Sequence, residues 1–189
     1  MGYDVFEYRD ELVSFFHDLN VSEWTQACEI LFNAYSNQKT VWIGGNGGNA
    51  SNAHHFATDW SKGLYKHTGK ALRSHTLWDN PSLVSAFSND QDFSLIYSDQ
   101  LSMSANFGDI TVLMSGGGAS ANIIEAAKRS RELGLLSVGL TGGRGRSISH
   151  LFDCHIHVPT DNISIVEDIH ATFGHTVMKF IINRHSESR

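Results

Sequence analysis

A chain of 189 residues with 41% hydrophobic and 18% charged residues has the composition of a folded globular protein, which excludes a disordered chain. Twenty acidic against fourteen basic side chains leave a net charge of −6 without a dense basic run, so nucleic-acid binding is not expected. The two cysteines exclude a disulfide framework, and no apolar run reaches the roughly 20 residues that cross a bilayer. We therefore expect a cytoplasmic protein that binds neither nucleic acid nor membrane.

The first 38 residues are predicted to be helical. Apolar residues recur there at helical spacing in two runs, and Ser22 is the expected N-cap of the second run. An α/β core is expected over residues 39–185. No proline-rich linker or charge run divides the chain, so residues 1–189 are predicted to form a single domain.

Beyond this segment, short apolar runs alternate with helical stretches, which is the pattern of βαβ units. The predicted strands are Thr40–Ile43, Ala71–Leu77, Ile110–Met114, Leu136–Leu140 and Cys154–Val158. The predicted helices are Ser51–Lys62, Pro81–Phe87, Phe93–Met103, Ser120–Leu133 and Ile163–Asn183. Right-handed crossovers place such helices on both faces of the sheet. The expected fold class is α/β, a three-layer αβα sandwich with a mainly parallel five-stranded sheet and N-terminal helices.

Two glycine-rich loops, Gly44–Ser51 and Ser115–Asn122, follow the first and third predicted strands. Ligands of such sheets bind beyond the carboxyl ends of the strands. Glycines let the backbone approach an anion, and the free N–H groups of the following helix point toward it. One such loop is as readily a tight turn without a ligand, but two at equivalent positions favour a phosphate compound.

The nucleotide forms of such loops fit poorly. Gly45–Ala50 matches the dinucleotide pattern G-x-G-x-x-G/A, which requires an acidic residue about 20 positions later. The available residue, Asp79, comes 29 positions after Ala50, and no Walker A loop is present. A nucleotide site is therefore not expected.

Histidines and carboxylates gather in two helical stretches. His55 and Asp59 are four residues apart and share one helical face. Asp168 and His175 share a stripe, whereas Glu167 lies about 80° round from His175. Two imidazoles with carboxylates suit a zinc ion and equally suit general acid–base catalysis. With eleven histidines in the chain, surface helices that carry histidine by chance are the alternative.

Two further polar groups allow more than one interpretation. Asn89-Asp90 is either an ordinary turn or a pair that closes over a sugar. His155 and His157 alternate along a short strand, so they share a face and are expected to be structural or solvent-facing.

Four sequence blocks occur in order along residues 5–185. They are GGNGGNASNAHHFATDW, the pair Asn89-Asp90, SGGGASANII and IVEDIHATFGH. Together they resemble the phosphoheptose isomerase family, whose members have a sugar-isomerase (SIS) domain. That family converts sedoheptulose 7-phosphate to D-glycero-D-manno-heptose 7-phosphate, so the resemblance implies a ketose–aldose isomerase that works through an enediol.

The resemblance also implies a role for each matching residue. The substrate-binding residues would be Asn46, Gly47, Gly48, Asn49, Asp59, Asn89, Asp90, Glu167 and, around the phosphate, Ser115, Gly116, Gly117 and Ser120. One zinc ion per subunit would be held by His55, Asp59, Glu167 and His175. Asp59 and His175 would form the acid–base pair. The family forms homotetramers with active sites near subunit contacts, so a homotetramer that uses the N-terminal helices is implied.

Several residues depart from the family pattern. The phosphate loop S-T-S-G-N-S is here S-G-G-G-A-S, which removes two hydroxyl donors worth about 1 kcal/mol each, and Asn49 replaces a third serine. The family's catalytic glutamate is Asp59, and its metal-binding glutamine is Glu167, which adds a negative charge that should strengthen metal binding. Two alternatives therefore stand beside phosphoheptose isomerisation: isomerisation of another sugar phosphate, and a non-catalytic regulator that binds a protein partner or a sugar phosphate.

Overall fold

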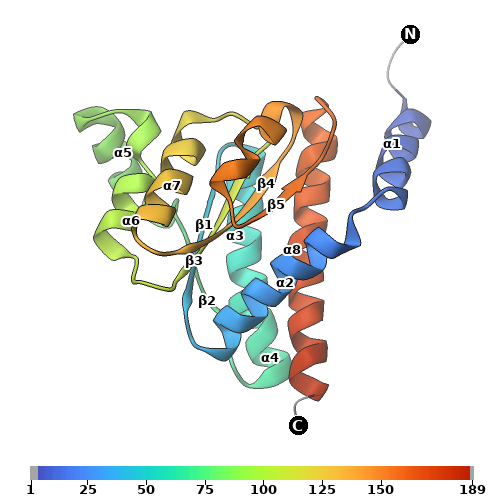
Figure 1. Ribbon diagram of the computed structural model, residues 1–189, viewed down its shortest axis with the longest axis horizontal. Coiled ribbons are helices and arrows are strands. Elements are labelled where there is room, and N and C mark those ends of the chain that lie inside the picture. The colour runs from blue at the N-terminus through green and yellow to red at the C-terminus, as the bar shows by residue number, and fades with distance from the viewer. Residues whose placement is uncertain (1–3, 188–189) are drawn as a thin grey trace.

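The computed structural model describes residues 4–187 and is built around a five-stranded sheet (Figure 1). The strands are β1 (Thr40–Gly45), β2 (Arg73–Thr76), β3 (Ile110–Ser115), β4 (Leu136–Thr141) and β5 (Cys154–His157). Their order is β2-β1-β3-β4-β5, and every neighbouring pair is parallel. After β1 the chain forms β2 on one side of that strand and then crosses back to form β3 on its other side. The strand order therefore reverses between β1 and β3. Crevices at such reversals hold the ligands of open α/β sheets.

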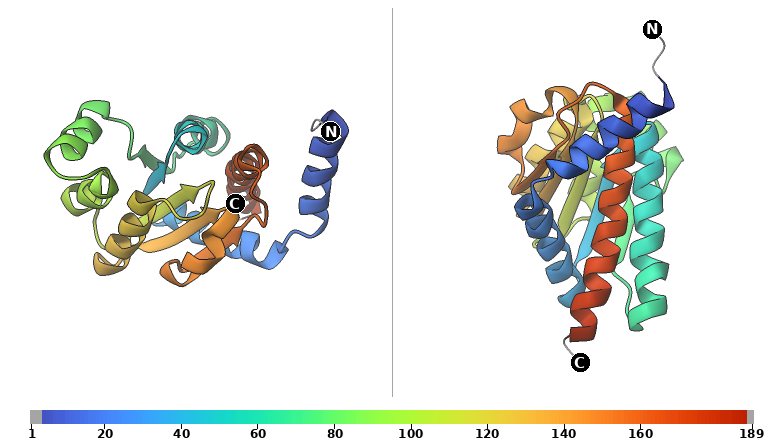
Figure 2. Two further views of the ribbon diagram at one scale, coloured as in Figure 1. Left: turned by 90° about the horizontal axis from the view of Figure 1, so that it is seen from above. Right: turned by 90° about the vertical axis from the view of Figure 1, so that its right-hand side faces the viewer.

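Helices cover both faces of the sheet, which confirms the three-layer α/β prediction (Figure 2). One face packs against α2 (Val21–Ser36), α3 (Gly48–Thr58) and α8 (Ile163–Glu187). The other packs against α5 (Pro81–Asp90), α6 (Ser98–Ser104) and α7 (Ala121–Glu132). Because the central strands are covered on both faces, β3 is buried along its whole length, whereas the edge strand β2 leaves Arg73 and His75 exposed.

Shorter helical pieces connect these elements. A π-helical turn over Asp59–Gly63 joins α3 to α4 (Leu64–Thr68). Two 3₁₀ stretches, Phe93–Leu95 and Gly143–Leu151, precede α6 and β5. The π-helical turn begins at Asp59, one of the predicted catalytic residues.

Helix α1 (Val5–His17) stands away from the body of the protein (Figure 1). Asp4 and Glu7 form a capping box at its start, but none of its residues is buried. Tyr8 donates to Asp168 of α8 at 2.6 Å, and Glu11 accepts from Thr160 at 2.6 Å. Leu12 and Phe15 pack partly against the core, whereas four other large apolar side chains of this helix remain exposed: Val5, Phe6, Val13 and Phe16.

The predicted strands are confirmed to within two residues at each end. Three helix starts were predicted wrongly. Helix α6 begins at Ser98 rather than Phe93, where the chain forms a short 3₁₀ stretch capped by Asp92 instead. Asn20, not Ser22, caps α2, because the helix begins at Val21, two residues earlier than expected, and the Asn20 side chain accepts from the Glu23 N–H. Helix α3 begins at Gly48 rather than Ser51, since its first turn packs on α8 and overrides the low helix propensity of glycine. No helix in the described range 4–187 has the length and apolarity to span a membrane.

Candidate active site

The two glycine-rich loops lie side by side at the point where the strand order reverses. The first leaves β1 at Gly45, and the left-handed φ of 58° at Gly47 turns the chain into α3. The second leaves β3 at Ser115 and turns at Gly118, whose φ is 77°, before α7. The side-chain amide nitrogen (Nδ2) of Asn49 lies 3.5 Å from the position that a Cβ on Gly116 would occupy, so the two loops are in contact.

Hydrogen bonds fix the first loop against the second. The side-chain amides of Asn46 and Asn122 bond reciprocally, with both distances 2.9 Å. The Tyr97 hydroxyl donates to the Gly45 carbonyl at 2.6 Å and lies 3.0 Å from the Asn46 side-chain oxygen. Burial raises the pKa of Tyr97, so the hydroxyl stays protonated and keeps its donor. Asn46 is therefore held rigidly, with its amide between the two loops.

The second loop has the geometry of an anion cradle. The hydroxyls of Ser115 and Ser120 lie 3.0 Å apart, and the Ser120 N–H points at the Ser115 hydroxyl at 3.4 Å. Gly117 is exposed and has open space around its Cα. Helix α7 starts directly behind Ser120, so its positive dipole end faces the loop.

Helices α3 and α8 run side by side, and α8 contacts the first turn of α3 (Figure 2). The Asn52 side chain donates to the Glu167 carbonyl at 2.9 Å. A Cβ on Gly48 would overlap the Glu167 carboxylate, which therefore lies at the start of α3. His170 is fully buried, and its Nδ1 lies 2.7 Å from the Asn49 side-chain oxygen.

Three of the four predicted metal ligands meet on the outer side of α3 and α8. The Nε2 atoms of His55 and His175 are 2.8 Å apart, and the Asp59 carboxylate lies 3.6 and 3.7 Å from them. The two imidazoles are about half exposed, at 48% and 53%, and Asp59 is 25% exposed, so an external ligand can reach them. Two nitrogen donors and one oxygen donor suit zinc.

Gly174 lets the two helices approach closely enough to form this cluster. A Cβ at Gly174 would overlap the Phe56 ring, and the Trp60 indole N–H donates to the Gly174 carbonyl at 2.9 Å. Both aromatic rings are fully buried and stack on each other. This packing fixes the backbone from which the histidines and the aspartate project.

The other predicted residues lie outside the cluster. The Glu167 carboxylate is at Gly48, two turns of α3 away from His55. The Asp168 carboxylate, on the stripe of His175 by helical spacing, instead accepts from Tyr8. Asn89 and Asp90 end α5 on the other face of the sheet, where they are exposed and bond to each other at 2.9 Å.

Sequence reasoning missed the contributions of Tyr97 and Asn122 to this region, and it did not predict that His170 is buried. For His170 a signal existed, because it falls on the apolar stripe of α8 with Val166, Ile169 and Phe173. Tyr97 and Asn122 carry no local signal, since their partners lie far away in the sequence.

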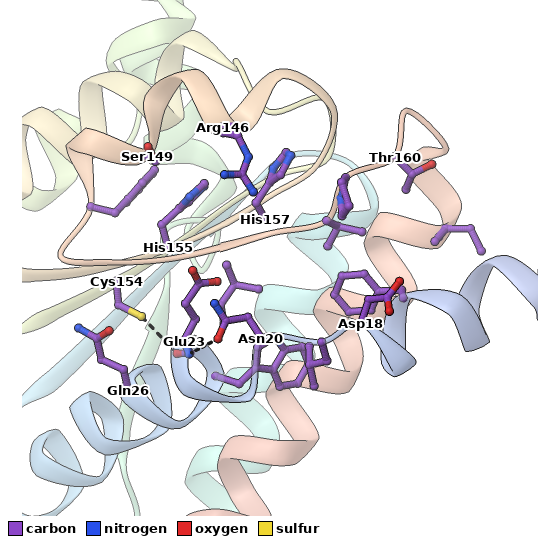
Figure 3. Close-up of a pocket in the computed structure, with 18 of the residues that line it drawn as sticks. Asp18, Asn20, Glu23, Gln26, Arg146, Ser149, Cys154, His155, His157 and Thr160 are labelled. Atoms are coloured by element: carbon purple, nitrogen blue, oxygen red, sulfur yellow. Dashed lines mark hydrogen bonds between the residues drawn. The ribbon is translucent and has the colours of Figure 1, made fainter.

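A separate cavity of about 780 Å³ lies between β5 and helices α1 and α2, and no predicted site residue lines it (Figure 3). His155 and His157 face it beside Arg146, and both rings contact the Thr141 hydroxyl, at 2.8 and 3.3 Å. Burial, aided by His157 and Arg146, lowers the pKa of His155 to about 4. These histidines are therefore partly buried wall residues rather than solvent-facing ones.

Comparison with known proteins places this geometry in a family. The model of the SIS domain matches residues 6–142. A phosphoheptose isomerase of Campylobacter jejuni subsp. jejuni serotype O:6 is 35% identical over 156 residues, which are 82% of this chain and 83% of the relative. One from Aliarcobacter butzleri is 32% identical over 158 residues, 84% and 83% of the two chains. The solved phosphoheptose isomerase of Neisseria gonorrhoeae has a TM-score of 0.80 at 28% identity, covering 93% of this chain and 91% of that one.

Proposed function

The chain belongs to the phosphoheptose isomerase family of SIS-domain proteins, and on this basis we propose that it converts sedoheptulose 7-phosphate to D-glycero-D-manno-heptose 7-phosphate. The observation that carries the proposal is the cluster of His55, Asp59 and His175, formed by α3, the π-helical turn that follows it and α8, in a chain whose sheet also carries two anion-type loops. A carboxylate and an imidazole 3.7 Å apart provide the base and acid that an aldose–ketose isomerisation requires.

We place the substrate phosphate in the loop Ser115–Ser120. Two serine hydroxyls, exposed glycine backbone and the start of α7 all favour an anion there. The start of α3 is a poorer phosphate site because the Glu167 carboxylate already occupies its positive end. Asn46, Gly47 and Gly48 would then line the sugar, and Glu167 would accept hydrogen bonds from its hydroxyls.

The proposed reaction moves one proton between neighbouring carbons. Sedoheptulose 7-phosphate has its carbonyl at C2, so the Asp59 carboxylate takes a proton from C1 and an enediol forms. The enediol is complete once O2 has gained a proton, and the aldehyde forms at C1 when C2 gains a proton and the C1 hydroxyl loses its own. His175 is the acid that delivers the proton to O2 or to C2. Because Asp59 is one methylene shorter than glutamate, its reach depends on the π-helical turn that begins at this residue.

His55, Asp59 and His175 would also hold a zinc ion, and their donor types fit it. Bound zinc would polarise the substrate carbonyl and order the three side chains. Glu167 would join as the fourth ligand only by moving its carboxylate away from Gly48.

We further propose a cytoplasmic homotetramer whose sites are completed at subunit contacts. Ten residues of helix separate Asn49 from Asp59, about 15 Å along the axis, so phosphate loop and catalytic cluster are well separated within one chain. Asn89 and Asp90 lie at the end of α5, on the opposite face of the sheet from α3 and α8. The exposed apolar residues of α1 supply a surface that association would cover.

The test is steady-state kinetics with sedoheptulose 7-phosphate as substrate. Asp59→Asn and His175→Gln should each lower kcat by about 10²–10⁴-fold while thermal unfolding stays cooperative. His54→Gln is the matched control, because His54 neighbours His55 but faces Asp79, and it should keep wild-type kcat. Unchanged turnover in either active-site variant refutes the mechanism. Turnover of a different sugar phosphate alone would reassign the substrate.

A further inference from the structure

A buried histidine without a role in the reaction contacts the phosphate region. His170 of α8 is fully buried, Asn49 of α3 is 2% exposed, and His170 Nδ1 lies 2.7 Å from Asn49 Oδ1. Burial lowers the pKa of His170 to about 3, so the ring is neutral and carries one N–H. The position of that proton decides which way the Asn49 amide points.

The surroundings of the ring fix the proton on Nδ1. His170 Nε2 is buried and has no hydrogen-bond partner within the described residues. A proton on Nε2 would leave a buried N–H unsatisfied, which is rarer and costlier than an unsatisfied acceptor. Nδ1–H therefore donates to the Asn49 side-chain oxygen, and the amide nitrogen of Asn49 points away from His170.

That amide nitrogen faces the phosphate loop, 3.5 Å from where a Cβ on Gly116 would lie. The loop has no side-chain donor of its own at Gly116 or Gly117. Contacts of Glu167 on α8 with the first turns of α3 keep Asn49 in place. The Glu167 carbonyl accepts from the Asn52 side chain, and the Glu167 carboxylate fills the space at Gly48. An N–H held in this way costs little ordering entropy when an anion binds.

We propose that His170 is a positioning residue that fixes the Asn49 amide as a hydrogen-bond donor to the substrate's phosphate group. The identity of the sugar rests on the proposed function, but the phosphate contact does not. Asn49 thereby supplies a donor to a loop with only two serine hydroxyls, and the buried imidazole makes that donor permanent.

Variants separate positioning from mere packing. His170→Leu should raise both the Kd of inorganic phosphate and the KM of sedoheptulose 7-phosphate about tenfold, with kcat retained. His170→Asn can still donate from nearly the same place and should restore most of the affinity. In an Asn49→Ala background, His170→Leu should add nothing. Val177→Ala, on the buried side of α8, is the control that lowers stability without changing the Kd or the KM.

Wild-type protein gives an answer that no folding defect can obscure. Nitrogen-15 NMR should show His170 protonated at Nδ1, and inorganic phosphate should shift the Asn49 side-chain amide signals. A proton on Nε2, an unmoved amide, or unchanged phosphate affinity in His170→Leu overturns the proposal. Weaker phosphate binding in His170→Leu, in a protein that does not isomerise the heptose, would uphold it and reject the proposed substrate instead.

Discussion

Gly118 lies at a crowded turn of the proposed phosphate loop, and Gly118→Ala should both destabilise the fold and weaken phosphate binding. Its φ of 77° lies in the left-handed region, which costs an alanine about 1–2 kcal/mol. The added Cβ would also overlap the backbone of Gly142 and Gly145, and forcing such atoms apart costs about 1–3 kcal/mol. The sum is about 2–5 kcal/mol, or a fall in Tm of about 4–20 °C for a chain of this size.

Gly117→Ala is the matched control for this loss of stability. Gly117 has open space around its Cα and no left-handed φ, so its substitution should change the unfolding free energy by less than about 0.5 kcal/mol. Thermal unfolding of both variants without phosphate, followed by a phosphate titration of Gly118→Ala, tests the reasoning. Equal Tm values for the two variants, or wild-type phosphate affinity in Gly118→Ala, would refute it.

Three further measurements address other parts of the molecule. Tyr97→Phe removes the donor to the Gly45 carbonyl and should lower the unfolding free energy in urea by about 1–2 kcal/mol; no change would mean that this bond contributes nothing. His155 has a pKa of about 4 when folded and 6.5 as a free side chain, so the unfolded chain binds a proton first. Stability should therefore fall as pH drops from about 6.5 toward 4, less steeply in His155→Gln, and equal slopes would contradict this. Metal analysis should find zinc in the wild type and in His54→Gln but not in His55→Ala; zinc retained in His55→Ala would remove the proposed ligand set.

The layer structure was predictable because short apolar runs alternate with helical stretches along the chain and a central strand is buried on both faces. A run such as Ile110–Ser115 contains no charged residue, and only a doubly covered parallel strand needs that composition. The start of α3 was not predictable. Gly48 is a poor helix former, and it is helical because the Glu167 carboxylate, far away in the sequence, packs against it.

The cluster of His55, Asp59 and His175 could be predicted only in part. Helical spacing joins the first two, but nothing local links them to His175, which is 120 residues from His55. Helical spacing also favoured Asp168 as a partner of His175. In the structure the Asp168 carboxylate instead accepts a hydrogen bond from Tyr8 of α1. The contact of His170 with Asn49 is equally non-local. The place of His170 on the apolar stripe of α8 indicates that it is buried, but it does not indicate which residue it contacts.

The most direct test of the proposed isomerase is NMR of sedoheptulose 7-phosphate incubated with zinc-supplemented protein in D₂O. The account predicts that deuterium enters at the carbons that exchange the proton and that the aldose phosphate appears, with neither change in Asp59→Asn. If a folded wild-type protein neither exchanges the carbon-bound hydrogens of the sugar for deuterium nor forms the aldose phosphate, the proposed reaction is contradicted.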